Sequence, residues 1–229
     1  MDPMLLLLAC AGAFVGTHFI LSHPLRRPLV AALGEKGFLG VYSLVAFATL
    51  WSISWAYPKA PVTAPLWNVG DGIWALASVM MLAASVLLLG SLIRNPALPG
   101  ATNAASAEAR GVFAITRHPM MWAFALWGVV HILVYPVTRN IIVAVAIIVL
   151  SLVGASLQDR KKAGLDPQGW TAWQSRTSYW PFVAIAQGRA RFGGFGAHAI
   201  AGGVVVWLLA TWAHIPLAGR AAGIWRWLV

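Results

Sequence analysis

The sequence predicts an all-α integral membrane protein, a polytopic bundle of about six transmembrane helices. Of the 229 residues, 60% are hydrophobic and only 10% are charged, and the mean hydropathy is +0.76. A soluble domain carries about 25% charged residues, so this chain has too few charges to cover a surface in water. Several of its apolar runs also approach the roughly 20 residues that cross a bilayer.

The apolar runs define the predicted spans, which we take as one transmembrane domain over residues 1–229. They cover residues 4–22, 38–56, 72–93, 119–135, 140–157 and 197–213. The first run is preceded by Asp2 and followed by Arg26 and Arg27, which is the reverse of the charge order of a signal peptide. We therefore expect a retained first helix.

The basic residues gather in alternate linkers. The net charge is +10, and twelve of the 16 Lys and Arg residues lie between spans one and two, three and four, or five and six. The positive-inside rule then predicts that both termini lie outside the cytoplasm. Basic loops in membrane proteins meet anionic lipid headgroups, so we expect membrane lipids as partners and no nucleic acid.

Two linkers have features of their own. After the third run, Pro96, Pro99 and Gly100 prevent the helix from continuing. The linker between the fifth and sixth runs interleaves aromatic residues with Arg176, and the aromatic residues are Trp170, Trp173, Tyr179 and Trp180. This pattern favours an interfacial amphipathic helix with its rings at headgroup depth.

The chain lacks the residues that most common catalytic mechanisms require. The six acidic residues lie near span ends or in loops, which leaves no buried carboxylate pair. The serine nucleophile motif is missing, and Cys10 has no partner for a disulfide or a cysteine-based metal site. The histidines remain.

His18 lies within the first run and His131 within the fourth. A single buried imidazole is satisfied by one hydrogen bond and needs no function. Two such histidines on separate helices make a poor zinc site, because zinc requires three or four protein ligands. A haem iron requires only two, which membrane b-type cytochromes commonly supply as histidines from facing helices.

The depths of the histidines restrict the pairing. The predicted orientation puts His18 and His131 about 10 Å apart along the membrane normal, so both would reach one iron only with a tilted haem. His118 and His131 are about 20 Å apart on one helix and cannot share an iron, which leaves His18 with His118 as the reserve pair. We expect His198 and His214 to be structural, although His198 could meet His18 on the inner side.

The start of the fourth run carries a second group of residues, Thr116, Arg117, His118 and Pro119. Proline in the first turn favours a helix start. The free backbone N–H groups there, together with Arg117, would attract an anion such as a haem propionate, a carboxylate or a phosphate. The alternative is an Arg-His pair that anchors the helix to lipid headgroups.

Three stretches resemble the NnrU family of bacterial membrane proteins, which is related to plant 15-cis-zeta-carotene isomerase. They are His18 followed by LRRPLVAALGEKGFLGVYSL, then ITRHPMMWAFALWGVVH, and then WTAWQSRTSYWPFVAIAQGR. The resemblance implies a bacterial inner-membrane protein with a b-type haem, whose axial ligands would be His18 and His131. Arg117 and His118 would be further cofactor-binding residues. Plant isomerases have a cysteine three residues before the fourth-span histidine, where this chain has Gly128.

The resemblance leaves three functions open. The family is linked to nitrite and nitric oxide reduction, which implies a haem-based redox, accessory or nitric-oxide-responsive component. The related isomerases imply a haem-dependent cis-trans isomerase of a lipophilic polyene such as a carotene. The Arg-His-Pro run is also similar to isoprenylcysteine carboxyl methyltransferases, in which it helps to hold S-adenosylmethionine. Those enzymes have acidic residues after the next helix, whereas here Asp159 stands among Arg160, Lys161 and Lys162.

Overall fold

A computed structural model describes residues 1–229 except 99, 102 and 103. Over the described residues, every regular element is a helix, which confirms the predicted all-α class. The long helices are α1 (Pro3–Ser22), α2 (Arg26–Ala56), α3 (Asp71–Gly90), α5 (Pro119–Val134), α6 (Thr138–Leu165) and α9 (Ala197–Ala218). The short ones are η1 (Tyr57–Lys59), α4 (Val112–Ile115), α7 (Pro167–Arg176), α8 (Val183–Ala186) and η2 (Gly223–Trp227).

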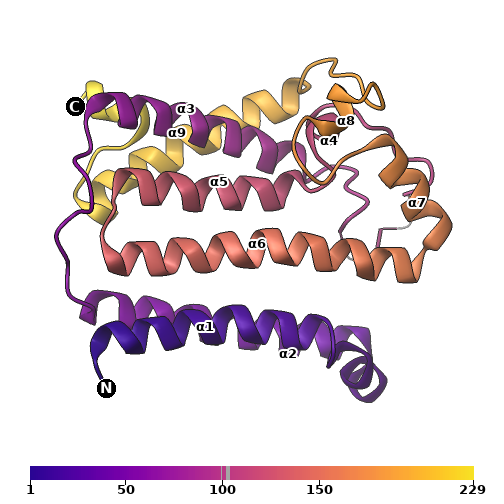
Figure 1. Ribbon diagram of the computed structural model, residues 1–229, viewed down its shortest axis with the longest axis horizontal. Helices are drawn as coiled ribbons and strands as arrows, with labels where there is room; N and C mark the ends of the chain where they lie inside the picture. Colours follow the sequence, from indigo (N-terminus) through magenta and orange to yellow (C-terminus); the bar gives the residue numbers. More distant parts are fainter. Residues whose placement is uncertain (99, 102–103) are drawn as a thin grey trace.

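The long helices lie side by side in the order α2, α1, α6, α5, α3 and α9 (Figure 1). The α1–α2 pair packs on α6 through α1, and α5 packs between α6 and α3. Helix α6 therefore separates the N-terminal pair from the group formed by α3, α5 and α9. The short helices α4, α7 and α8 gather at one end of the bundle.

The chain is a multi-pass membrane protein. Five helical segments within the described residues are long and apolar enough to cross a membrane, namely α1, α2 continued into η1, α3, α6 and α9. Helix α5 corresponds to the fourth predicted span and is apolar but has only 16 residues. It is about 24 Å long at 1.5 Å per residue.

Several helix ends follow from local sequence. Asp2 caps α1, because its Oδ1 accepts hydrogen bonds from the backbone N–H groups of Met4 (2.9 Å) and Leu5 (3.0 Å). Helix α2 begins at Arg26, well before the predicted boundary at 38, and is kinked at Gly34, which has φ +70°. Glycine adopts this conformation without the steric cost that a Cβ brings. The polar residues before position 38 therefore form the first part of a helix that bends at Gly34.

The linker after α3 partly confirms the prediction. Helix α3 ends at Gly90, and Pro96 and Gly100 lie beyond it outside any helix. Pro99 lies outside the described residues.

A helix, α7, forms within the linker as predicted, but two of its rings pack inside the protein and do not face lipid headgroups. Trp170 and Trp173 are fully buried inside the protein, where the Trp173 ring contacts that of Phe113. The segments that follow α3 fold over this end of the bundle and cover the apolar side of α7. Trp180 is largely exposed, as is Phe182 two residues later.

Candidate functional site

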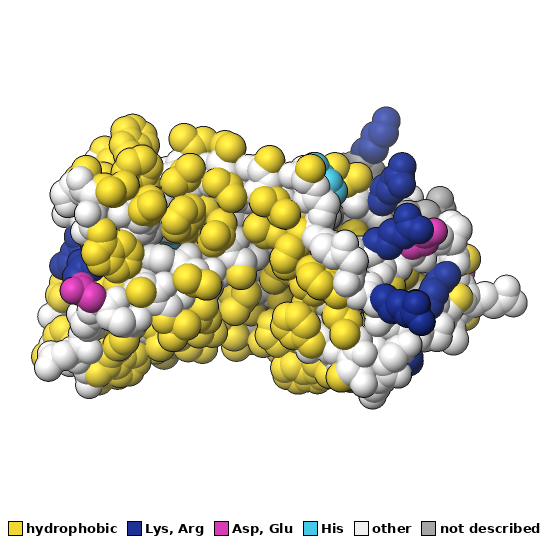
Figure 2. Space-filling model, turned by 90° about the horizontal axis from the view of Figure 1, so that it is seen from above, with side chains coloured by type: hydrophobic (Ala, Val, Ile, Leu, Met, Phe, Trp, Pro, Cys, Tyr) yellow, Lys and Arg dark blue, Asp and Glu magenta, His cyan; other side chains and the backbone are white. Residues whose placement is uncertain are grey.

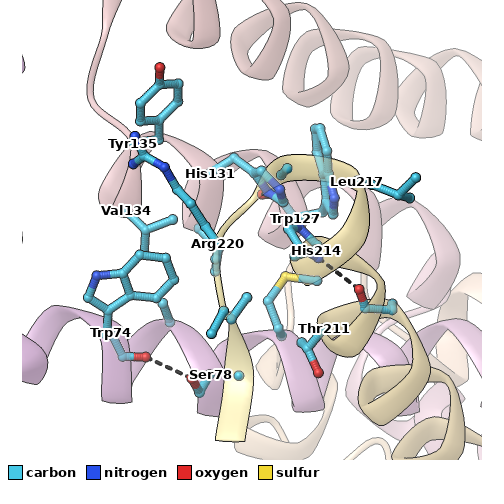
Figure 3. Close-up of a pocket in the computed structure, with 18 of the residues that line it drawn as sticks. Trp74, Ser78, Trp127, His131, Val134, Tyr135, Thr211, His214, Leu217 and Arg220 are labelled. Carbon is cyan, nitrogen blue, oxygen red and sulfur yellow. Dashed lines mark hydrogen bonds between the residues drawn. The ribbon is translucent and has the colours of Figure 1, made fainter. Parts of the chain in front are cut away.

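A cavity of about 600 Å³ lies between α3, α5 and α9, and we call it the histidine cavity. His131 from α5 and His214 from α9 stand on its wall (Figure 3). The segments that follow α5 and α9 complete the lining at one end. Three helices that are distant in sequence therefore enclose one apolar space.

The two imidazole rings on the wall of this cavity lie close to each other. Their centroids are 6.3 Å apart and their planes are inclined by 36°. The Nδ1 of His131 donates to the backbone carbonyl of Trp127 (2.8 Å), and the Nδ1 of His214 donates to that of Ala210 (2.7 Å). Because each Nδ1 carries the proton, each Nε2 keeps a lone pair that can bind a metal.

The other walls are mostly apolar, with two cations at one end. Trp74, Trp127 and Trp207 supply large aromatic surfaces. Arg139, at the start of α6, and Arg220, after the end of α9, line the cavity as well. Figure 3 shows Arg220 extending beside His131 and Tyr135, and its guanidinium carbon lies 5.2 Å from the centroid of the Tyr135 ring.

Asn140 holds the end of α5 that carries His131. Its Nδ2 donates to the backbone carbonyls of His131 (2.8 Å) and Tyr135 (2.7 Å). These carbonyls lie at the C-terminal end of α5, where they also accept from the backbone N–H groups of Tyr135 (3.0 Å) and Val137 (2.9 Å). Asn140 is buried, so the bonds fix the position of His131 against α6.

The structure does not bring His18 and His131 together. The Nδ1 of His18 donates to the carbonyl of Phe14 (2.6 Å), and its ring contacts those of Phe14 and Tyr42. Helix α6 lies between α1 and α5 (Figure 1), and the two histidines also lie at different levels along it.

The levels can be read along α6 itself. His131 is bonded to Asn140, whereas Phe19, the neighbour of His18, lies against Gly154. The fourteen positions between these two points of α6 correspond to about 21 Å. The depth difference predicted from the sequence is therefore larger in the structure, and no tilt of a planar group spans it.

Arg117 and His118 are held by a carboxylate of the protein itself. Arg117 Nε donates to Asp159 Oδ1 (2.9 Å) and Oδ2 (2.8 Å), its Nη2 also contacts Oδ2, and His118 Nε2 lies 2.7 Å from Oδ1. The side chains are 11%, 1% and 12% exposed for Arg117, His118 and Asp159. The negative charge beside Arg117 is thus that of Asp159. This residue lies in α6, because the helix continues past the predicted run 140–157 to Leu165.

Tyr179 closes this cluster. Its ring contacts that of His118, and its hydroxyl donates to the carbonyl of Leu152 (2.6 Å). Burial raises the pKa of Tyr179, and the negative charge of Asp159 raises it further. The Arg117, His118 and Asp159 cluster thereby ties α5, α6 and the linker after α7 together, so the pairing of His118 with His18 finds no support in the geometry. Pro119 starts α5 as predicted.

Comparison with known families assigns the chain. The family model described as NnrU protein matches residues 5–222. The chain belongs to the NnrU family. The match runs from α1 to the segment after α9, so it includes α3, α5 and α9, the three helices around the histidine cavity. Neither the curated proteins nor the solved structures gave a match.

Sequence reasoning missed the position of His214 beside His131 in this NnrU chain, although a signal was present. The fourth and sixth runs cross the bundle in the same direction, so their C-terminal ends lie at the same level. His131 and His214 are both near those ends. His18 is near the C-terminal end of a run that crosses in the opposite direction. His198, at the start of α9, lines a different cavity.

Proposed function

We propose that this protein holds a b-type haem in the histidine cavity, with His131 and His214 as its two axial ligands. The spacing of the imidazoles carries the proposal. With metal–nitrogen bonds of about 2 Å and each ring centre about 1 Å behind its nitrogen, two imidazoles on opposite sides of one iron have centres about 6 Å apart. The observed separation is 6.3 Å.

The donor set of the cavity fits this group. Within the described residues, no group of three or more His, Cys, Asp or Glu side chains is placed to hold a metal ion. A porphyrin supplies four nitrogen ligands of its own, so two histidines are sufficient. Arg139 and Arg220 stand at the end of the cavity where they would neutralise the propionate carboxylates.

The protein's own residues would prepare the site. The carbonyls of Trp127 and Ala210 orient the two rings and set their tautomers. Asn140 holds the end of α5, and the tryptophan-rich walls would give the group an apolar surrounding. A haem held by two histidines would supply one-electron transfer with a low reorganisation energy. We therefore propose a redox or accessory role. The link of the NnrU resemblance to nitrite and nitric oxide reduction agrees with that role.

A second candidate is a haem-dependent cis-trans isomerase of a lipophilic polyene. The aromatic surfaces of Trp74, Trp127 and Trp207 in the histidine cavity favour it, since such surfaces suit an extended apolar substrate. Conversion of a cis-carotene by the reduced protein would distinguish this activity from electron transfer alone. The methyltransferase alternative loses support, because Asp159 occupies both Arg117 and His118.

The visible spectrum of protein expressed with ample haem tests the proposal. We expect a Soret band in the parent protein, and loss of the band or of its six-coordinate form in both His131→Ala and His214→Ala. His18→Ala is the matched control, because His18 makes the same bond to the carbonyl four residues before it but lies across α6. A band that persists in His214→Ala and disappears in His18→Ala would contradict the ligand pair.

A further inference from the structure

A second cavity, of about 1200 Å³, lies at the other end of α3 and α9, and we call it the basic cavity. Its lining comes from the end of α3 and the residues after it, from residues 106–113, and from residues 191–198 that lead into α9. The histidine cavity contacts α3 near Trp74 and α9 near His214. The two cavities are therefore separated along the same pair of helices.

The basic cavity carries an excess of positive charge. Arg94, Arg110 and Arg191 line it together with His198, and Glu108 is the one acidic residue among the lining residues that the structure describes. Glu108 is paired with Arg110. Figure 2 shows a large group of Lys and Arg side chains at the right-hand end of the molecule, beyond the hydrophobic surface, and a smaller group at the opposite end.

Two of the arginines have no partner among the residues that the structure describes. Arg94 and Arg191 are exposed, and neither makes a hydrogen bond or an ion pair with another described residue. Arg94 also has φ +53°, a conformation that costs energy for a residue with a Cβ. The lining of one cavity therefore includes two arginines whose charges no described residue compensates.

Large apolar side chains stand beside these charges. Ile93 and Phe192 adjoin Arg94 and Arg191 in sequence, line the same cavity, and are 50% and 45% exposed. A soluble anion gains nothing from such neighbours. An amphiphile gains from both parts, because its charged group meets the arginines and its hydrocarbon covers the apolar side chains.

We propose that the basic cavity is a binding site for an anionic phospholipid, with the phosphate held by Arg94 and Arg191 and the acyl chains against Ile93 and Phe192. A guanidinium group binds two phosphate oxygens at once through two parallel N–H donors. Basic pockets between transmembrane helices bind anionic headgroups. The start of α9 beside the cavity adds its positive dipole end. This site is independent of the proposed haem, so either proposal can fail alone.

Native mass spectrometry of the delipidated protein in detergent tests the site, with phosphatidylglycerol and phosphatidylcholine as probes. We expect the parent protein to retain phosphatidylglycerol in preference to phosphatidylcholine. Arg94→Gln combined with Arg191→Gln should weaken phosphatidylglycerol binding by roughly tenfold or more, since each cationic side chain near the headgroup contributes substantially. If the double variant does not fold, Arg191→Gln alone carries the test, because this side chain is exposed and unpaired.

The matched control is Arg27→Gln combined with Lys36→Gln, which removes the same charge from exposed residues near the turn between α1 and α2. This turn lies at the same end of the bundle (Figure 1). Retention of phosphatidylglycerol by the control supports the site. Equal losses in both double variants would show a diffuse effect of surface charge and overturn the proposal. Displacement of the lipid by millimolar inorganic phosphate would also overturn it, because the site would then select a free anion.

Discussion

The histidines of this chain differ in which ring nitrogen makes a hydrogen bond within the protein. His131 and His214 each direct Nδ1 to the carbonyl four residues earlier, so Nε2 stays available as a ligand. His118 uses Nε2 to meet Asp159, and its Nδ1 is buried without a partner in the described structure. The same residue type therefore serves as a candidate ligand in one place and as part of an ion cluster in the other.

Asp159→Asn tests the ion cluster. Removing one partner of a buried pair leaves the other charge uncompensated, so we expect the free energy of unfolding to fall by about 3 kcal/mol. Thermal unfolding of the purified protein in detergent would measure the change. The histidine cavity lies far along α6 from Asp159, so any haem spectrum should be preserved.

Asp71→Asn is the matched control for that variant. Asp71 pairs with Arg226, but its side chain is 75% exposed. An exposed pair contributes less than about 1 kcal/mol. Equal losses in the two variants would mean that burial of the Arg117, His118 and Asp159 cluster has no energetic weight.

Close contacts between helices determine the geometry at the scale of elements. A Cβ added to Gly203 of α9 would lie 2.8 Å from the Cα of Val86 on α3, which is backbone and cannot give way. A Cβ on Gly128 of α5 would lie 2.9 Å from the carbonyl oxygen of Ala144 on α6. Small residues let helices in a membrane approach closely, and these contacts set the distance of α9 from α3 and of α5 from α6.

Gly203→Ala tests this packing. The added methyl group must separate α9 from α3, which should destabilise the protein by about 1–3 kcal/mol and move His214 relative to His131. Thermal unfolding and the visible spectrum would detect the two effects. Gly12→Ala is the control, because a Cβ at Gly12 meets nothing within 4 Å. A silent Gly203→Ala would show that α3 and α9 are not tightly packed.

The whole molecule is polarised along the bundle. The basic cavity and the Arg117, His118 and Asp159 cluster lie at one end, and the histidine cavity opens toward the other. The alternation of basic linkers predicts that the first end faces the cytoplasm. The histidine cavity would then lie nearer the outer surface, with Arg139 and Arg220 at its outer edge.

Labelling with a membrane-impermeant maleimide tests the orientation in a Cys10→Ala background. We expect Ala64→Cys, in the exposed segment between η1 and α3, to react in intact cells. Ala105→Cys, exposed beside the basic cavity, should react only after the membrane is permeabilised. The opposite pattern would invert the orientation and place the histidine cavity on the cytoplasmic side.

The sequence predicts the long helices of this protein better than the residues of its candidate site. The apolar runs identified all six long helices, because a bilayer-spanning helix needs only a continuous apolar sequence. They missed the start of α2 before Gly34 and the extension of α6 to Leu165, because polar helices outside the apolar runs carry no hydropathy signal. The position of His131 within a predicted span and the family resemblance both mark it as a candidate ligand, whereas His214 lies just beyond the predicted run 197–213.

Composition, charge and periodicity by themselves determined that the chain is a helical membrane protein with alternating basic linkers, because the bilayer constrains each span separately. They could not determine which spans are neighbours. The tertiary structure decided that α6 separates His18 from His131. It also decided that α9 places the ring centroid of His214 6.3 Å from that of His131. Helix order depends on contacts such as those at Gly203 and Gly128, in which the relevant partner lies far away in sequence.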